Sequence, residues 1–539
     1  MAFVEQTATL LKDTRLRLIL LAGIMIQVVV CITAIGIYHP DQYFQIIEFS
    51  SYQLNRASAA GHVWEFAARL RPTLQVYLFS GYYKLCSGLG IRDPYVQLAL
   101  LRLLFGLLLF FFFNGITLFY LRREDRRILY FVLLLLNFTW ILPYTRTLYS
   151  SEMLSSVLFF AAVILYETGG RRGGMPAVRR VGPVGTGDAD GPMESGGSSP
   201  AEKDAAGRAA MWVYPTAGFL MSLAFYTRFQ TGFAIVGFVI WMVWPGKELR
   251  RLLPLGAGFL AGVLLNTGLD HGFYHQWVCT PYTYFRVNII EGKAASMGVS
   301  SFLLYIAVLI AVVLAPPLSI FLLFAGFRSA LLTKLDKPIV LSVVCFIVGH
   351  CLVAHKEERF LFPILNVLPV FIGWGLPGLL AWVGRQRNGW RSLIKGAAWF
   401  SVGLNTLLLV VILFTPYSQA IYFTWQLKKN FRGAPVTIYS LGHTPFETEE
   451  RLPFVFYESG ARNLRWKRLS VNDSLSAIGD RAEYVSTTYN QIGGRKAYLD
   501  SLGYQAVFYS SHLLWGINEL LSSMKMNTIN DIWVLYKKK

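Results

Sequence analysis

The chain has 539 residues, of which 54% are hydrophobic and only 15% are charged, and its mean hydropathy is +0.45. Long apolar runs recur up to about residue 415, which excludes a soluble globular protein, and runs such as residues 100–121 lack the alternation of membrane-barrel strands. The net charge of +19 would indicate a nucleic-acid partner in a soluble protein, but here it is explained by Lys and Arg in cytoplasmic loops.

We therefore predict a multi-pass α-helical membrane protein, because helices satisfy their own backbone hydrogen bonds in lipid. Lys12, Arg15 and Arg17 precede the first apolar run, so the N-terminus should be cytoplasmic. Residues 39–98 then form a first outer loop, in which the polar run 74–85 is interpreted as an interfacial helix rather than a span. The pattern predicts about eleven spans, at residues 16–37, 100–121, 129–143, 154–166, 211–226, 231–244, 252–269, 302–327, 339–354, 360–383 and 397–414.

Two segments differ from these spans in composition. Residues 168–210 are rich in Gly, Pro, Ala and Ser, which predicts a disordered cytoplasmic linker. Residues 416–539 carry short β-like runs with helical patterns between them, at 436–441, 454–457, 484–487, 506–509 and 532–536. We expect two domains, a transmembrane catalytic domain over 1–415 and a small soluble α/β domain over 416–539 on the outer face.

In this topology, charged residues from separate hairpins meet on the outer face. Loops rich in Lys and Arg without paired acids fall on the cytoplasmic side. The outer groups are His39 with Asp41, Arg146 with Glu152, Arg228, the aromatic-rich loop 270–300, and residues 355–359. Ionisable residues beside spans are costly unless they serve a function, so we predict a functional site on this face.

The first of these groups is the stretch Tyr38-His39-Pro40-Asp41-Gln42-Tyr43-Phe44-Gln45, directly after the first span. On its own it is also compatible with an ordinary interfacial loop. In a site, Asp41 is a candidate general base, cation ligand or proton-relay carboxylate, with His39, Gln42 and Gln45 as the neighbours that hold it. Glu48 lies on the same face if a helix continues, but it is more typical of a solvated carboxylate.

The last group is His355-Lys356-Glu357-Glu358-Arg359. An anchoring turn, in which the cations reach lipid headgroups, explains the basic residues but not the two adjacent acids. A phosphate bound by His355, Lys356 or Arg359, with Glu357 or Glu358 orienting these cations or a hydroxylated substrate, explains both.

Single arginines on the same face extend this hypothesis. Arg71, Arg146 and Arg228 are each typical of an interfacial anchor, but together they predict a phosphate clamp. The aromatic residues of the loop 270–300 are compatible with sugar stacking and equally with an aromatic belt. The cysteines Cys31, Cys86, Cys279, Cys345 and Cys351 lack metal-ligand spacing, and we expect no metal and no cofactor.

These motifs resemble the integral-membrane mannosyltransferases of the GT-C superfamily, in particular the group with the GPI-anchor mannosyltransferases and the lumenal mannosyltransferases of N-glycan assembly. The motifs are His39-Pro40-Asp41-Gln42, Arg146-Thr147 to Glu152, Arg228-Phe229-Gln230-Thr231, residues 277–288, and above all His355-Lys356-Glu357-Glu358-Arg359-Phe360, within residues 16–380. The resemblance implies a metal-independent, inverting transfer from a polyprenyl-phosphate-linked mannose. It implies Asp41 as the catalytic base and residues 355–359 as binding groups for the donor phosphate or the acceptor.

Two departures from the family widen the prediction. Residues 291–305 lack the Gly-rich, His- and Trp-containing pattern of the eukaryotic GPI enzymes, and the 168–210 insertion is unusual. Both leave open a bacterial relative with an undecaprenyl-type donor. The expected location is therefore the bacterial cytoplasmic membrane or the endoplasmic reticulum membrane, with the site on the outer or lumenal face.

The predicted function is transfer of mannose from the lipid-phosphate donor to a hydroxyl of a lipid-linked or membrane-associated glycan. Its partners are this donor, a glycan or glycolipid acceptor and membrane lipid, and not nucleic acid. One alternative is a GT-C-fold transferase that uses another polyprenyl-phosphate sugar, such as a pentose or an aminosugar. Another is a lipid or glycan transporter, which would place ionisable residues near the middle of spans, at broken helices.

Overall fold

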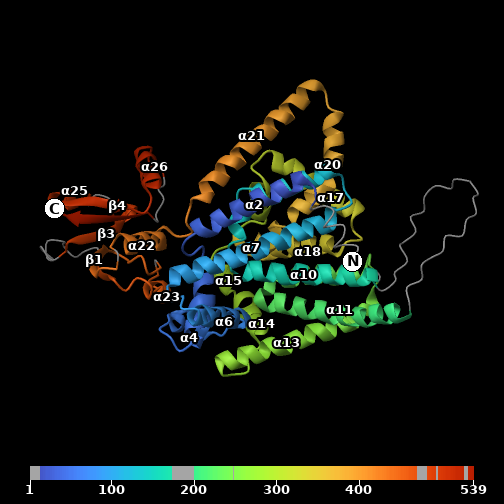
Figure 1. Cartoon of the computed structure of the whole chain (residues 1–539), viewed down its shortest axis with the longest axis horizontal. Coiled ribbons are helices and arrows are strands. Elements are labelled where there is room, and N and C mark those ends of the chain that lie inside the picture. The colour runs from blue at the N-terminus through green and yellow to red at the C-terminus, as the bar shows by residue number, and fades with distance from the viewer. Residues whose placement is uncertain are drawn as a thin grey trace, which may run out of the picture.

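The computed structural model describes residues 12–172, 200–246, 248–431, 433–448, 450–469, 482–492, 496–526 and 532–539. A bundle of helices forms most of the molecule, and a five-stranded sheet lies at one end of the bundle (Figure 1). Of the predicted linker 168–210, α10 reaches Arg172 and α11 begins at Pro200, while residues 173–199 lie outside the described residues.

Each of the predicted spans contains a helix. The long helices are α2 (Thr14–Thr33), α7 (Pro94–Leu121), α10 (Ser151–Arg172), α11 (Pro200–Thr227), α13 (Leu252–Tyr274) and α21 (Asn388–Leu413), and the shorter ones are α8 (Arg126–Phe138), α9 (Leu142–Thr145), α12 (Gly232–Val243) and α18 (Pro338–Leu352). Among the described residues, five helices are long and apolar enough to cross a membrane, or seven if each of two bent pairs is one span. The count of eleven is therefore not confirmed.

The bent pairs correct the prediction of continuous spans. Residues 302–327, predicted as one span, are α16 (Leu303–Val313) and part of α17 (Leu318–Thr333), which meet at 107°. Pro316 and Pro317 separate them, because proline lacks the backbone donor and its ring clashes with the preceding turn. Residues 360–383 are likewise broken between η6 (Glu358–Leu361) with α19 (Phe362–Leu365) and α20 (Leu368–Gly384), at 67°.

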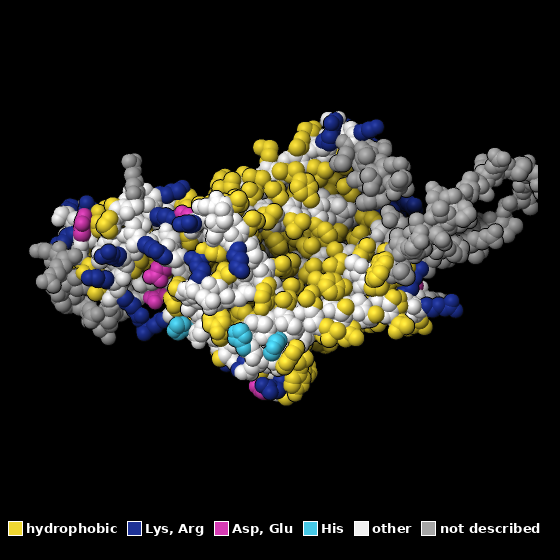
Figure 2. Space-filling model, turned by 60° about the horizontal axis from the view of Figure 1, so that its bottom comes forward, with side chains coloured by type: hydrophobic (Ala, Val, Ile, Leu, Met, Phe, Trp, Pro, Cys, Tyr) yellow, Lys and Arg dark blue, Asp and Glu magenta, His cyan; other side chains and the backbone are white. Residues whose placement is uncertain are grey.

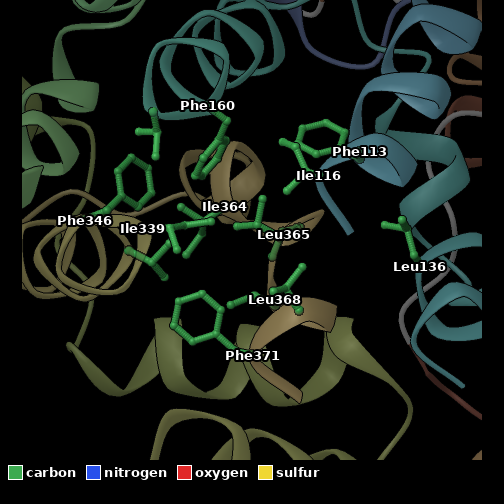
Figure 3. Packing of buried hydrophobic residues seen from close by; sticks show 14 of the residues in the cluster. Phe113, Ile116, Leu136, Phe160, Ile339, Phe346, Ile364, Leu365, Leu368 and Phe371 are labelled. Atoms are coloured by element: carbon green, nitrogen blue, oxygen red, sulfur yellow. The ribbon is translucent and has the colours of Figure 1, made fainter. Parts of the chain in front are cut away.

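The short helix α19, which precedes the second break, lies within the bundle core. Ile364 and Leu365 point among Phe160 of α10, Phe346 of α18 and Phe113 of α7 (Figure 3), and all of these side chains are buried. The core thus fixes the segment that directly follows the predicted charged turn 355–359. By contrast, the face of the bundle seen in Figure 2 is largely apolar between two ends that carry Lys and Arg, as expected of a surface that faces lipid.

The segment predicted as the first outer loop consists of short helices packed across one end of the bundle. They are α3 (Pro40–Gln42), the π-helix η1 (Tyr43–Glu48), α4 (Phe49–Gln53), η2 (Ala60–His62), α5 (Trp64–Ala67) and α6 (Leu74–Gly88). With 15 residues, α6 is too short to span a bilayer, in line with the interfacial helix predicted for residues 74–85. At the same end are η3 (Phe229–Thr231), α14 (Thr280–Phe285), η5 (Arg286–Ile290) and α15 (Lys293–Ser296), whereas η4 (Leu249–Arg251) starts α13 at the opposite end.

The C-terminal region begins with α22 (Gln419–Asn430) and forms a mixed sheet in the order β2-β1-β3-β5-β4. Its strands are β1 (Val436–Leu441), β2 (Leu464–Leu469), β3 (Tyr484–Thr488), β4 (Tyr504–Tyr509) and β5 (Trp533–Lys538), with α23 (Val455–Glu458), α24 (Tyr489–Ile492), α25 (Lys496–Ser501) and α26 (His512–Ser523) between them. Strand β1 is parallel to β2 and β3, and β5 is antiparallel to β3 and β4.

Two details of the predicted strands are corrected. Residues 454–457, predicted as a strand, form the single helical turn α23, whose Phe456 and Tyr457 are buried against the first outer loop. The edge strand β2 was not predicted, because Arg465, Lys467 and Arg468 interrupt its apolar pattern. Charged side chains are usual on an edge strand, where they prevent pairing with another chain.

Candidate functional site

The first outer loop presents Asp41 at the end of the bundle. His39 is the N-cap of α3, and its Nδ1 accepts a hydrogen bond of 3.3 Å from the backbone N–H of Asp41. Pro40 occupies the first helical position, where its fixed φ is favourable. The carboxylate of Asp41 remains 34% exposed, and its Oδ2 accepts a 2.6 Å hydrogen bond from Nη2 of Arg359.

Arg359 connects the first outer loop to the turn 355–359. Its Nε donates to Oε2 of Glu357 at 2.5 Å, so one guanidinium bridges two carboxylates while it is only 7% exposed. Oε1 of Glu357 lies 3.0 Å from Nε2 of His355, and Oε2 lies 3.6 Å from Nε2 of His39. Nδ1 of His355 lies 3.0 Å from the carbonyl oxygen of Gly298, so both ring nitrogens of His355 have a polar neighbour.

This network sets the charge of the candidate base. Burial raises the pKa of the Asp41 carboxyl, but the nearby guanidiniums of Arg359 and Arg71 outweigh burial and hold this pKa well below its usual range. Asp41 is therefore ionised at neutral pH. Burial, followed by the charge of Arg359, lowers the pKa of His39, which favours the neutral ring that accepts from the Asp41 backbone.

A second ion pair comes from two neighbouring long helices. Glu152 lies in the first turn of α10, and Arg228 directly follows α11. Nη2 of Arg228 is 3.2 Å from Oε1 of Glu152, and the two side chains are only 6% and 3% exposed. The guanidinium of Arg228 also lies over the ring of Phe360, 4.7 Å from its centroid. This packing holds Arg228 beside the residue that follows Arg359.

A third ion pair closes the site from the first outer loop. Nη2 of Arg71 lies 2.5 Å from Oε1 of Glu65, whose Oε2 accepts from Nε2 of Gln45 at 2.7 Å. The Arg71 guanidinium faces the ring of Tyr284 at 5.6 Å. Glu65 was not predicted to be a site residue, because a single acid in a loop carries no signal that distinguishes it from a solvated one.

The three ion pairs surround one partly open cavity. Its lining residues are Asp41, Gln42, Gln45, Ile46, Arg71, Pro72, Gln75, Ser151, Glu152, Thr227, Arg228, Phe229, Gln230, Tyr284 and Arg359. The structure thus brings together the predicted residues of the first outer loop, of the α10 and α11 ends, and Arg359. His39, His355 and Glu357 contact this lining through the network around Arg359.

Other predicted residues of the turn 355–359 lie outside the lining. Lys356 is buried, donates to the carbonyl of Val353 and lies over the ring of Tyr305 at 5.9 Å. Glu358 accepts from the hydroxyl of Tyr38 at 3.2 Å on the exposed side of the turn. The chain changes from extended backbone at Glu357 to the 3-10 helix η6 at Glu358, and of these five residues Arg359 lines the cavity.

Arg146 is also absent from the cavity lining. Its side chain is fully buried in the bundle core, where Nε donates to Oδ1 of Asn366 at 2.8 Å and Nη1 to Oδ1 of Asn137 at 3.1 Å. Nη2 donates to the carbonyl of Leu136. Within the described residues, these partners are neutral oxygens, and they hold the segment before Glu152 in place. Arg146 thus has a structural role in the bundle core, next to the segment that leads to Glu152.

Some lining residues were not among those predicted. Gln230 donates from Nε2 to the hydroxyl of Tyr284 at 2.9 Å, and Gln75 donates to the backbone carbonyl of Tyr149 at 2.6 Å. Gln230 belongs to the motif Arg228-Phe229-Gln230-Thr231, and Tyr284 belongs to the aromatic-rich loop 270–300. Both residues could therefore have been predicted as site residues from the sequence. Among the described residues, no group of three His, Cys, Asp or Glu side chains is placed to hold a metal ion.

The arrangement combines two chemical capacities. The guanidiniums of Arg71, Arg228 and Arg359 face one cavity and can form charge-assisted hydrogen bonds with a phosphate. Within the described residues, the contacts of the Asp41 carboxylate fall on Oδ2, which leaves Oδ1 available for the proton of a hydroxyl. A group that accepts a proton thus lies beside a site for an anionic leaving group.

A comparison with protein families agrees with this chemistry. A family model described as the Alg9-like mannosyltransferase family matches residues 18–439. The match confirms the resemblance predicted from the sequence motifs.

Individual relatives are more distant. The chain is 23% identical over 367 residues to GPI alpha-1,2-mannosyltransferase 3 of Homo sapiens, which covers 68% of this chain and 58% of the human protein. It is 26% identical over 132 residues to GPI mannosyltransferase 3 of Debaryomyces hansenii, over 24% of this chain and 23% of that protein. The chain thus spans less than two thirds of the length of these relatives.

Among solved structures, the fold is similar to that of ArnT from Cupriavidus metallidurans bound to undecaprenyl phosphate. The TM-score is 0.50 at 12% sequence identity, and the match covers 97% of this chain and 98% of that chain. The likeness extends over the bundle and the C-terminal sheet together.

Proposed function

Because the chain belongs to the Alg9-like mannosyltransferase family, we propose that it transfers mannose from a polyprenyl-phosphate-linked donor to a hydroxyl of a lipid-linked or membrane-associated glycan. The observation that carries this proposal is the placement of the ionised Asp41 at a cavity lined by Arg71, Arg228 and Arg359. ArnT, which is similar in fold, was solved with undecaprenyl phosphate, and this polyprenyl phosphate supports the donor class.

In the proposed reaction, Oδ1 of Asp41 accepts the proton of the acceptor hydroxyl. The acceptor oxygen forms a bond to the anomeric carbon as the bond from this carbon to the phosphate oxygen breaks. The electron pair leaves with the phosphate, whose charge Arg359 and its neighbours stabilise. A single displacement of this kind inverts the anomeric configuration, and the phosphate is already a good leaving group.

The cavity has further groups that suit a sugar. Gln42, Gln45, Gln75 and Gln230 line it beside Tyr284, and amide side chains both donate to and accept from hydroxyls. A transporter would need a pathway with ionisable groups near the middle of its spans. The site residues instead lie at helix ends and in the first outer loop, which supports an enzyme.

The donor class is tested by comparing the rates of transfer from different sugar donors. Purified protein in detergent receives radiolabelled polyprenyl-phosphate mannose, or the same lipid phosphate with glucose, an aminosugar or a pentose, together with a lipid-linked glycan acceptor. We expect transfer from the mannose donor to be at least about tenfold faster, with inverted configuration in the product, since hydroxyl contacts in a polar site discriminate strongly. Preference for another lipid-linked sugar, or for a nucleotide sugar without the lipid, would contradict the proposal.

A further inference from the structure

The π-helix η1 separates the cavity from the C-terminal region. Gln45 and Ile46 of η1 line the cavity on one side, together with Asp41 and Gln42 of α3, which directly precedes η1. Tyr43, Phe44 and Glu48 are buried on its other side, against residues of the C-terminal region. A π-helix is rare and frequently occurs at functional sites, where its wide turn changes the direction of side chains. Asp41 lies in α3, which runs directly into η1, so the position of η1 bears on where the Asp41 carboxylate lies.

The buried side of η1 is held by an unusual polar contact. Glu48 is fully buried, and its Oε1 accepts from the hydroxyl of Tyr43 and, at 3.1 Å, from the backbone N–H of Phe456 in α23. Its Oε2 accepts from the backbone N–H of Ala59 at 2.9 Å. The Phe456 N–H also lies 2.9 Å from the Tyr43 hydroxyl oxygen. These donors satisfy a buried carboxylate that would otherwise be costly.

Aromatic packing surrounds this contact. The Tyr43 ring lies 5.0 Å from the ring of Phe454 and 5.9 Å from that of Tyr457, and the Phe44 ring lies 5.6 Å from that of Phe454. These residues belong to one hydrophobic core that joins the first outer loop to strand residues such as Trp533. Figure 1 shows α23 next to the end of α7, on the side of the bundle where the loop lies.

We propose that the C-terminal domain fixes the position and rotation of η1 through α23. In this proposal Glu48 is the positioning residue through which the contact with α23 fixes the place of Asp41. Both carboxyl oxygens of Glu48 accept hydrogen bonds, from Tyr43 and Phe456 on one and from Ala59 on the other, so Glu48→Gln places an NH₂ donor where an acceptor is needed and η1 loses its fixed rotation. Asp41 then moves relative to the cavity, while Arg228 and Arg359, which Glu152 and Glu357 hold outside the first outer loop, keep their places. This inference rests on the proposed function for its catalytic consequence, but not for its structural one.

The first test measures structure without activity. Hydrogen–deuterium exchange on the full chain compares wild type with Glu48→Gln. We expect faster exchange of the amides of residues 41–48 and unchanged exchange in α10 and α11. The matched control is Glu458→Gln, the same substitution at an exposed residue of α23, which should leave the exchange of η1 unchanged. Equal exchange in Glu48→Gln and wild type would overturn the proposal, whatever the donor proves to be.

The second test measures catalysis. Glu48→Gln should lower kcat by roughly 10- to 100-fold, because a small displacement of a reacting group has an effect of this size, while the KM of the donor stays within about twofold. In an Asp41→Asn background, the same substitution should have little further effect. A full additional loss in that background, or a change in KM alone, would overturn the role. Tyr43→Phe removes one hydroxyl from the same contact and gives a milder variant if Glu48→Gln does not fold.

The two proposals fail in different ways. If Asp41→Asn keeps the wild-type rate, the proposed catalytic role fails, and the exchange data still decide whether Glu48 holds η1. If the exchange of η1 does not respond to Glu48→Gln, the positioning role fails while Asp41 remains the base.

Discussion

At the scale of single residues, the pairing of Asp41 with Arg359 is the central feature of the site. One guanidinium both lowers the pKa of the candidate base and lies where it can bind a phosphate. An anionic sugar donor that binds at Arg359 would compete with the Asp41 carboxylate for the N–H groups of this guanidinium. The pKa of Asp41 would then rise when the phosphate leaving group is in place, which makes Asp41 a stronger base.

The pH dependence of the reaction tests this pairing. In the wild type, Arg359 holds the pKa of Asp41 below its usual range, so the acidic limb of kcat/KM lies below about pH 4. In Arg359→Gln, burial acts without this opposing charge and raises the pKa, so the limb should move to higher pH by about 1–3 units. Arg228→Gln is the control, since Arg228 pairs with Glu152 rather than Asp41; it should lower the rate without moving the limb. An unmoved limb in Arg359→Gln would contradict the pairing.

Which residues meet could be predicted from the sequence only in part. Asp41, Glu152, Arg228 and Arg359 were found because charges at span ends are costly, so their presence is itself a signal. Arg146 has the same signal, yet its partners are amide and backbone oxygens from distant segments, which sequence cannot show. Contacts between residues far apart in the chain depend on how the helices pack, and this packing cannot be read from a single sequence.

At the scale of elements, the site depends on close packing of α11 against α13. A Cβ added to Gly258 would lie 1.8 Å from the carbonyl oxygen of Pro215, and one added to Gly218 would lie 1.8 Å from that of Leu255. Small residues of this kind allow membrane helices to approach closely. The packing sets the end of α11, which places Arg228 at the cavity.

Gly258→Ala should therefore separate α11 from α13. We expect the free energy of unfolding to fall by about 1–3 kcal/mol, as for overpacked interiors, and thermal unfolding in detergent measures the change. Gly256→Ala, on the same helix, is the control, because a Cβ there meets nothing within 4 Å. Equal melting temperatures of the two variants would show that the contact does not determine the packing.

The elements themselves were easier to predict than their breaks. Apolar runs identified a helix in each predicted span, since membrane helices are long and uniformly apolar. The bends before α17 and α20 were missed, because proline inside an apolar run is also tolerated in continuous membrane helices. The turn α23 was taken for a strand, because its aromatic residues have high β-propensity and tertiary contacts with Tyr43 and Glu48 override that preference.

At the scale of the whole molecule, the first outer loop, which contributes Asp41 and Gln45 to the cavity, and the C-terminal sheet lie at the same end of the bundle (Figure 1). The sequence predicted this arrangement from the parity of spans and the distribution of Lys and Arg, and placed both on the outer or lumenal face. The helix ends that carry site residues do meet at one end. The side of the membrane on which they lie stays a prediction.

Cysteine labelling tests the side. Arg126→Cys and Asp500→Cys, both at exposed positions, are made in a background with Cys279→Ser, because Cys279 is exposed. With an impermeant maleimide and sealed vesicles of known orientation, Asp500→Cys should label only from the outer or lumenal side and Arg126→Cys only from the cytoplasmic side. Labelling of both from one side would contradict the topology.

The most direct test of the account is the rate of mannosyl transfer by Asp41→Asn. Transfer from radiolabelled polyprenyl-phosphate mannose is measured in membranes at equal expression, with Glu291→Gln as control, since Glu291 forms an exposed ion pair with Arg286. We predict a loss of about 10²- to 10⁴-fold for Asp41→Asn, as expected for removal of a general base, and a wild-type rate for the control. An Asp41→Asn rate equal to that of wild type would contradict the assignment of Asp41 as the base.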